Sequence, residues 1–293
     1  MLDIFSIPLP ALFGQLLLGL INGAFYAMLS LGLAVIFGML NVINFTHGAQ
    51  YMLGAFAAWL MLTHLSIPFW ASLVLAPLIV GLFGVVIERL FLKRIYHLDH
   101  LYGFLLTFGM ALVIEGLFQW RWGSSGAPYP APIPGGYNLG FMFMPAYRGF
   151  VVVAALVICL ATWYGIERTR LGAYLRAATE NPTLVRAFGI NVPLLITLTY
   201  GLGVGLAALA GVLAAPIQQV SPLMGSTLVL VVFAVVVIGG MGSIMGSIIT
   251  GFGLGLIEGF TKVVYPPASN TVIFVVMAIV LMVKPAGLFG QTK

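Results

Sequence analysis

Five hydrogen-bonding side chains stand close together in a stretch of the sequence that otherwise carries no charge. Between Asp3 and Glu88 the chain has no Asp, Glu, Lys or Arg, yet the segment NVINFTHGAQ, residues 41–50, holds two asparagines, a threonine, a histidine and a glutamine. Such groups can satisfy backbone atoms where a helix breaks, hold neighbouring helices together, or line the path of a polar solute. The candidates for helix-break or pathway roles are Asn22, Asn41, Asn44, Thr46, His47 and Gly48, and the glycine is expected to let the chain turn.

Two carboxylates, Glu115 and Glu258, fall within or near the ends of apolar stretches. A buried carboxylate with a shifted pKa can relay protons, whereas one that is paired or placed at the membrane interface is structural. His47 likewise can bind a ligand, carry a proton or hydrogen-bond a neighbouring helix. Together these three residues are the set that a proton-coupled transporter would use.

Other chemistry is not indicated by the sequence. No catalytic triad and no metal-ligand spacing appear, and the single cysteine, Cys159, rules out an all-cysteine metal site. The phosphate-binding pattern G-x-x-x-x-G-K-[ST] is also absent from the sequence. We therefore expect no catalytic residues, no metal, no cofactor bound by this chain and no ATP hydrolysis by it.

The composition describes the surroundings in which these residues must be held. Of 293 residues, 61% are hydrophobic and only 6% are charged, whereas soluble domains have about 25% charged residues. The apolar runs are continuous, which is typical of membrane-spanning helices and not of a transmembrane barrel, whose strands alternate. The net charge of +5 lies in short loops, so it does not indicate nucleic-acid binding.

The apolar runs predict an all-α, polytopic integral membrane protein with about 8–10 transmembrane helices, some of them broken, in a single transmembrane domain that covers residues 1–293. The first run is longer than one perpendicular crossing needs, so it must tilt, bend or break. We expect helices at about 12–40, 50–65, 68–87, 101–120, 150–165 and 194–215, further crossings through 225–260 after a turn at 218–222, and a last helix at 270–283.

Three loops interrupt these runs. Loops 88–100 and 167–192 are charged, whereas loop 121–148 is rich in Gly and Pro and should be an ordered loop of turns and extended pieces. Nine of the 12 Lys and Arg residues fall in the two charged loops and the tail, and three fall elsewhere. The positive-inside rule thus places those loops and the C-terminus in the cytoplasm, and loop 121–148 and the N-terminus outside. The N-terminus lacks the basic flank of a cleavable signal, so its helix should be retained.

The second charged loop contains the signals of a short helix. Thr179 or Asn181 can cap its start, Pro182 suits its first turn and Gly189 is a natural stop after about residue 188. A plain connection needs only a few residues. The loop is either an ordinary surface helix with anchoring arginines or a knob that docks on a cytoplasmic protein.

Three blocks resemble the branched-chain amino acid permease family of ATP-binding-cassette importers (the LivH type): residues 19–56, LRAATENPTLVRAFGINV at 175–192, and VVVIGGMGSIMGSIITGFGLGLIEG at 235–259. The resemblance implies that loop 167–192 carries the coupling helix that docks on an ATPase subunit. It also implies a second, related permease in a heterodimeric pore, two cytoplasmic ATP-binding subunits that use ATP, and an external solute-binding protein, all in the inner (plasma) membrane of a bacterium. The coupling-loop residues are Arg176, Ala177, Ala178, Glu180, Asn181, Pro182, Arg186, Gly189 and Asn191.

The sequence therefore favours an importer permease for branched-chain or related amino acids. A permease for urea or short amides, a proton-coupled secondary transporter and a passive channel remain alternatives. The docking loop discriminates the importer permeases, whichever of these solutes they carry, from the other two classes, because secondary transporters and channels do not need one.

Overall fold

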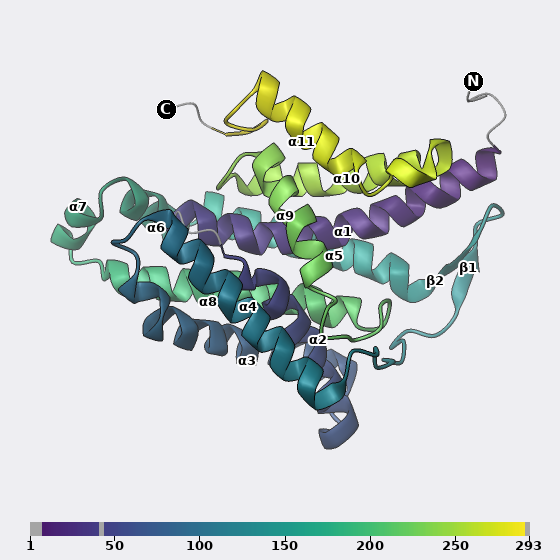
Figure 1. The fold of residues 1–293 in the computed structure, drawn as a ribbon, viewed down its shortest axis with the longest axis horizontal. Coiled ribbons are helices and arrows are strands. Elements are labelled where there is room, and N and C mark those ends of the chain that lie inside the picture. Colours follow the sequence, from purple (N-terminus) through teal and green to yellow (C-terminus); the bar gives the residue numbers. More distant parts are fainter. Residues whose placement is uncertain (1–7, 41–43, 291–293) are drawn as a thin grey trace.

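The computed structural model describes residues 8–40 and 44–290, and these residues form an almost entirely helical protein (Figure 1). The predicted all-α fold is confirmed. The helices are α1 (Leu9–Leu40), α2 (Thr46–Leu65), α3 (Phe69–Leu90), α4 (His100–Trp122), α5 (Ala146–Glu167), α6 (Arg170–Glu180), α7 (Pro182–Ala187), α8 (Val192–Ala214), α9 (Ser226–Gly239), α10 (Ile244–Val264) and α11 (Val272–Val283), with short 3₁₀ turns at Leu92–Arg94 and Pro266–Ala268.

Six of these helices are long and apolar enough to cross a membrane, namely α1, α3, α4, α5, α8 and α10. Helices α9 and α11 are apolar but shorter, with 14 and 12 residues, and α2 has 20 residues. A helix rises 1.5 Å per residue, so a 12-residue or 14-residue helix is shorter than a bilayer core of about 30 Å. The protein is thus a multi-pass membrane protein that combines long spans with shorter pieces.

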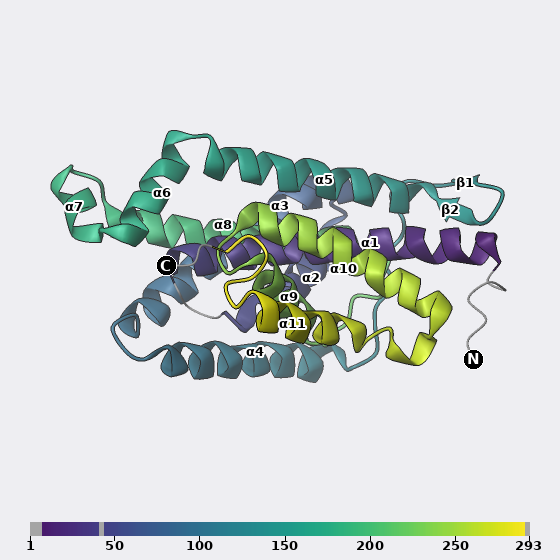
Figure 2. The ribbon, with the colours of Figure 1, turned by 90° about the horizontal axis from the view of Figure 1, so that it is seen from above.

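Helix α1 lies at the centre, and α4 and α5 lie along opposite edges (Figure 2). In the most apolar part of α1, 83% of the residues are buried by the rest of the chain, compared with 28% in α4 and 17% in α5. Helix α1 packs against α10, α8, α5 and α9, while α2 and α3 both pack on α8. The apolar sides of α4 and α5 that the chain leaves uncovered suit contact with lipid.

The most extensive helix contact is between α1 and α10, where both helices present glycines. A Cβ atom added at Gly19 would collide with the carbonyl oxygen of Gly255, and one added at Gly255 would collide with the backbone of Gly19 and Gly23. Small residues at such spacing let two helix backbones approach closely in a membrane. This contact fixes the middle of the fold.

The loop predicted at 121–148 covers only residues 123–145, since α4 continues to Trp122 and α5 begins at Ala146. It has the turns and extended pieces that were predicted. Strands β1 (Gly136–Asn138) and β2 (Phe143–Pro145) form an antiparallel hairpin in which Tyr137 lies opposite Met144. Earlier in the loop, the backbone of Ala127 pairs with that of Val220 through two N–H···O bonds of 2.9 Å. This bridge ties the loop to the turn between α8 and α9.

Helix α2 begins at Thr46, four residues before the predicted start. The prediction that Gly48 lets the chain turn is therefore wrong, because Gly48 lies inside α2. Its missing side chain serves packing instead, since an added Cβ would stand 2.6 Å from the carbonyl oxygen of Gly225. Asn41 lies outside the described residues.

The junction between α9 and α10 is made by glycines. Gly240 and Gly242 have φ angles of +100° and +84°, a region that L-residues with side chains avoid. The freed carbonyl oxygens of Ile238 and Gly239 accept hydrogen bonds from the backbone N–H groups of Leu288 and Phe289, at 2.8 and 3.1 Å. The tail thus closes the C-terminal end of α9.

Candidate functional site

The segment from α6 to the start of α8 is built by local capping signals. The Oδ1 of Asn181 accepts a hydrogen bond from the N–H of Leu184 at 3.0 Å, and Pro182 occupies the first position of α7. Gly189 ends the element with a φ of +82°. The Oδ1 of Asn191 then caps α8 by accepting from the N–H of Leu194 at 3.1 Å. The predicted short helix is present, and Asn181 rather than Thr179 caps it. Helix α6, which precedes it, was not predicted.

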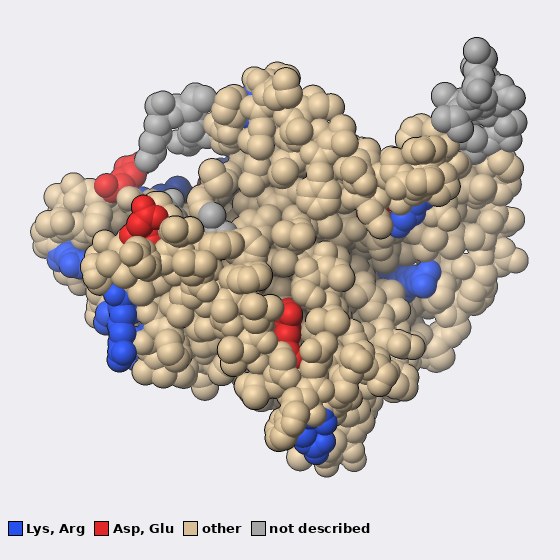
Figure 3. Space-filling model, in the orientation of Figure 1, with Lys and Arg blue, Asp and Glu red and all other residues tan. Residues whose placement is uncertain are grey.

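This α6–α7 element has a small core and an exposed rim. Ala178 is buried with Leu175, Val185 and Val192, whereas the other predicted coupling-loop residues are exposed. The apolar side chains of Leu184 and Phe188 are 53% and 77% exposed. Figure 3 shows that this end of the molecule holds the densest group of charged side chains on an otherwise largely uncharged face. Exposed apolar side chains among charges are typical of a protein contact surface.

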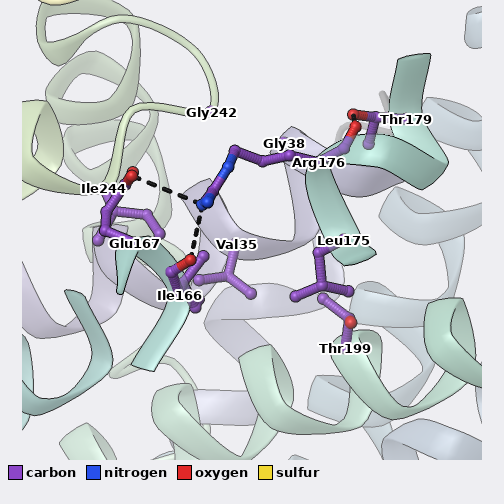
Figure 4. Close-up of a pocket in the computed structure, with 10 residues that line it drawn as sticks. All are labelled: Val35, Gly38, Ile166, Glu167, Leu175, Arg176, Thr179, Thr199, Gly242 and Ile244. Carbon is purple, nitrogen blue, oxygen red and sulfur yellow. Dashed lines mark hydrogen bonds and ion pairs between the residues drawn. The ribbon is translucent and has the colours of Figure 1, made fainter. Parts of the chain in front are cut away.

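Arg176 joins α6 to the body of the protein. Its guanidinium donates to the carbonyl oxygen of Ile166 at 2.7 Å and lies 3.5 Å from the carboxylate of Glu167, both at the end of α5 (Figure 4). Beneath it is a pocket of about 90 Å³. It is lined by the last turns of α1 and α5, by α6, by the first half of α8 and by the start of α10. Gly38 and Gly242 face each other there, because a Cβ at Gly242 would stand 3.1 Å from the Cα of Gly38. The α6–α7 element therefore rests on the place where the end of α1 meets the junction between α9 and α10.

A buried polar cluster occupies the start of α2. The Nδ2 of Asn44 donates to the Oε1 of Gln50 at 3.2 Å, and the Nε2 of Gln50 donates to the hydroxyl of Tyr200 in α8 at 3.2 Å. The Nε2 of His47 lies 2.9 Å from the carbonyl oxygen of Leu29 in α1. Since a carbonyl only accepts, this nitrogen carries the proton. The cluster thus connects α2 to α1 and α8.

The start of α2 is also bound to α4. The Oγ1 of Thr46 donates to the carbonyl oxygen of Thr107 at 3.0 Å, and the hydroxyl of Thr107 accepts from the N–H of Phe45 at 3.2 Å. All of the polar side chains from Asn44 to Gln50 that make these contacts are fully buried. Asn22 lies apart from them in α1, half-buried, about five turns before the end of that helix.

The two predicted carboxylates have different surroundings. Glu258 in α10 accepts a hydrogen bond from the Tyr26 hydroxyl at 2.7 Å and is paired with Lys262 at 2.5 Å, so its charge is compensated. Glu115 is 8% exposed on the inner face of α4. Among the described residues, no hydrogen bond or ion pair that the structure defines joins either carboxylate to His47. In the part of the chain that the structure describes, the three residues are thus not in direct contact with one another.

Comparison with known proteins decides the family. The family described as the permease component of branched-chain amino acid transport systems matches residues 15–283. The chain belongs to this family. Members of this permease family are transport subunits, so the chain is not itself an enzyme.

Relatives of this permease cover nearly its whole length. The high-affinity branched-chain amino acid transport system permease protein BraD of Pseudomonas aeruginosa is 28% identical over 294 residues, which cover 95% of this chain and 96% of that protein. LivH of Escherichia coli K12 is 27% identical with the same coverage, and a probable LivH of Methanocaldococcus jannaschii is 25% identical over 90% of this chain and 88% of its own. The ribose import permease protein RbsC of Escherichia coli is 35% identical over 33% of each chain. No solved structure matches the permease.

A further buried carboxylate of the permease, Glu88, was missed because the sequence places it at the edge of a charged loop. It is 1% exposed at the end of α3, where it accepts from the Tyr96 hydroxyl at 2.9 Å and from the Thr197 hydroxyl of α8 at 2.7 Å. Burial, together with the neighbouring carboxylate, raises the pKa of Tyr96, so its hydroxyl keeps the proton that it donates. Glu88 thus ties α3 and the following loop to α8, the helix that follows α7 after the turn at Gly189.

Proposed function

We propose that this permease translocates branched-chain or related amino acids as the membrane subunit of an ATP-binding-cassette importer. Two cytoplasmic ATPase subunits drive it, an external binding protein delivers the solute, and a second, related permease completes the pore. The importer lies in the inner (plasma) membrane, with loops 88–100 and 167–192 in the cytoplasm and loop 121–148 outside. Family membership and the named transport role of the full-length relatives support the solute class.

The observation that carries the proposal is the exposed rim of the α6–α7 element. Leu184 and Phe188 are presented to solvent by a helix that is capped at its start and ended by a left-handed glycine. Arg176 fastens the element to α5. A rigid knob with apolar tips suits insertion into a groove of an ATPase subunit, and motion of that subunit would then reach α5 and α8 directly.

The docking role is tested with the double variant Leu184→Ser/Phe188→Ser in the complete transporter. We expect the ATPase subunits to be lost on purification from membranes, and amino-acid uptake to fall at least about tenfold, since exposed apolar anchors at an interface carry much of its binding energy. The matched control is Leu98→Ser, a leucine that is 42% exposed in the other charged loop. Normal co-purification and uptake by the double variant would exclude the docking role.

The orientation is tested separately by labelling intact cells with a membrane-impermeant maleimide. In a Cys159→Ser background, which removes the one buried native thiol, we expect Ser124→Cys to react from outside and Thr183→Cys to react only after the cells are opened. Both positions are exposed in the structure. The reverse pattern would contradict the proposed sidedness.

A further inference from the structure

A second pocket lies at the opposite end of the protein from the α6–α7 element, where α4 passes into loop 121–148. It has a volume of about 180 Å³. Three aromatic side chains form one wall, Phe56 and Trp59 from α2 and Trp122 from the end of α4, and the other wall is made by residues 125–127 and Val220. Pockets for drug-sized molecules measure about 300–1,000 Å³. This one suits a single side chain of a small molecule.

The walls of this second pocket, which we call the outer pocket, are held in place by their own contacts. The ring centroid of Phe56 lies 5.6 Å from that of Trp122 and 6.2 Å from that of Trp59, in tilted and edge-on arrangements. The opposite wall is fixed by the two backbone bonds between Ala127 and Val220. Gly126 has to stay small, because an added Cβ would collide with the side chain of Gln219. The outer pocket is therefore a preformed feature and not a gap between mobile loops.

A cation stands beside the apolar walls. The guanidinium carbon of Arg121 lies 5.3 Å from the centre of the Trp122 ring, and the Arg121 side chain is exposed. The ion pairs found among the described residues involve Arg176 and Lys262, so Arg121 has no carboxylate partner there. The exposed Ser125 adds a hydroxyl on the facing wall. Arg121 is not itself a lining residue, but it lies against the ring of Trp122, which is one. An apolar slot with an exposed guanidinium against one of its lining rings matches a molecule that is aliphatic at one end and carries a carboxylate at the other.

We propose that the outer pocket is a receiving site for the transported amino acid, in which the aromatic wall holds the aliphatic side chain and Arg121 binds the α-carboxylate. This inference rests on the proposed function, including the outward position of loop 121–148, and adds a solute-binding site on the permease itself. Arg binds carboxylates in a two-pronged geometry that Lys cannot reproduce, and the Trp122 ring stabilises the cation where no acid does. A lipid acyl chain carries no charge along its length, so the guanidinium would not strengthen its binding as it strengthens that of an amino acid.

The site is tested by photo-crosslinking of the complete transporter in lipid nanodiscs with a leucine analogue that carries a diazirine in its side chain. We expect the label on peptides that contain residues 122–127 and 220. Unlabelled L-leucine should compete about tenfold better than leucinamide, since removing the carboxylate removes one charge-assisted interaction. Labelling that leucinamide and L-leucine suppress equally, or that a fatty acid suppresses instead, would overturn the amino-acid site in favour of lipid.

Two variants sharpen the experiment. Arg121→Gln should lower the labelling about tenfold, and Trp59→Ala should lower it while the affinity difference between leucine and leucinamide persists. The matched control is Arg148→Gln, the other arginine predicted on the outer side, which should label as the unmodified protein does. Unchanged labelling in both Arg121→Gln and Trp59→Ala would overturn the proposal. If the transporter imports no amino acid but the pocket is still labelled, the proposed function fails and the site stands. If uptake is normal but the pocket is not labelled, the proposed function stands and the site fails.

Discussion

Two regions where the chain changes direction are held by different chemistry. The first junction is residues 44–50 at the start of α2, and the second junction is the turn between α9 and α10. At the first, buried polar side chains at the start of α2 reach out to three other helices, as the contacts of Thr46, His47 and Gln50 show. At the second, Gly240 and Gly242 bend the backbone directly, and hydrogen bonds from the tail satisfy the carbonyl groups that α9 leaves free. Gly242 of the second junction also contacts Gly38, near the end of α1.

The difference teaches how each junction tolerates change. Side-chain hydrogen bonds can be removed one at a time, and each loss costs the free energy of one or two buried polar groups. A glycine at positive φ that contacts another backbone tolerates no substitution. Any side chain there both strains the backbone conformation and collides with the neighbouring helix. The first junction should therefore respond to substitution in graded steps, and the second should fail at once.

The largest effect is expected for Gly242→Val. Valine disfavours the φ of +84° and its Cβ would stand 3.1 Å from the Cα of Gly38. We expect a loss of more than about 3 kcal/mol in the free energy of unfolding, which is enough to abolish a monodisperse purified protein. Size-exclusion chromatography and the unfolding temperature in detergent measure it.

The matched control for that variant is Gly253→Val, the same change inside α10. An added Cβ there has nothing within 4 Å. Its yield and unfolding temperature should remain near those of the unmodified protein. If the two valine variants behave alike, the junction does not depend on the glycine backbone and the comparison is broken.

An intermediate effect is expected for Gln50→Leu in the polar cluster. The change leaves the amide of Asn44 and the hydroxyl of Tyr200 without the partner that they have here, at a cost of about 2 kcal/mol in the free energy of unfolding. Thermal unfolding in detergent measures it. The triple variant Asn44→Leu/Gln50→Leu/Tyr200→Phe removes every member of that chain of hydrogen bonds, so it should regain most of the loss. A triple variant less stable than Gln50→Leu alone would contradict the idea that these three side chains only satisfy one another's hydrogen bonds.

The smallest effect is expected for Ser243→Ala at the second junction. The Oγ of Ser243 accepts from the N–H of Gly246 at 3.1 Å and caps α10. Removing such a cap costs about 1 kcal/mol of stability. The control is Ser226→Ala at the start of α9, where the hydroxyl donates to Leu223 and caps nothing, so the change should be smaller. Equal shifts in unfolding temperature for the two variants would contradict the capping role.

Local signals in the sequence predicted the parts of the fold that depend on neighbouring residues. Asn181, Pro182 and Gly189 act within one short helix, and the structure has that helix where the capping rules put it. The long apolar runs likewise predicted the spans, because lipid leaves few alternatives to a helix. Sidedness and the docking role remain predictions.

Features that depend on distant residues could not be predicted in this way. Gly48 was taken for a turn, but its reason for being glycine is the backbone of Gly225, which only the fold brings near. Glu88 was assigned to a loop on the basis of its charge, whereas Thr197 and Tyr96 bury it in the fold. The hydrogen bond between Tyr26 and Glu258 likewise depends on the tertiary fold, since one residue lies in α1 and the other in α10.

The tail that covers the end of α9 also sets an order of events during synthesis. Leu288 and Phe289 leave the ribosome well after Gly239, so the carbonyl groups of Ile238 and Gly239 have to wait for their partners while α10 and α11 are inserted. The second junction can therefore reach its final form only when translation has passed residue 289. A stop codon placed just after α11 would yield a chain that has every helix and an unfinished junction.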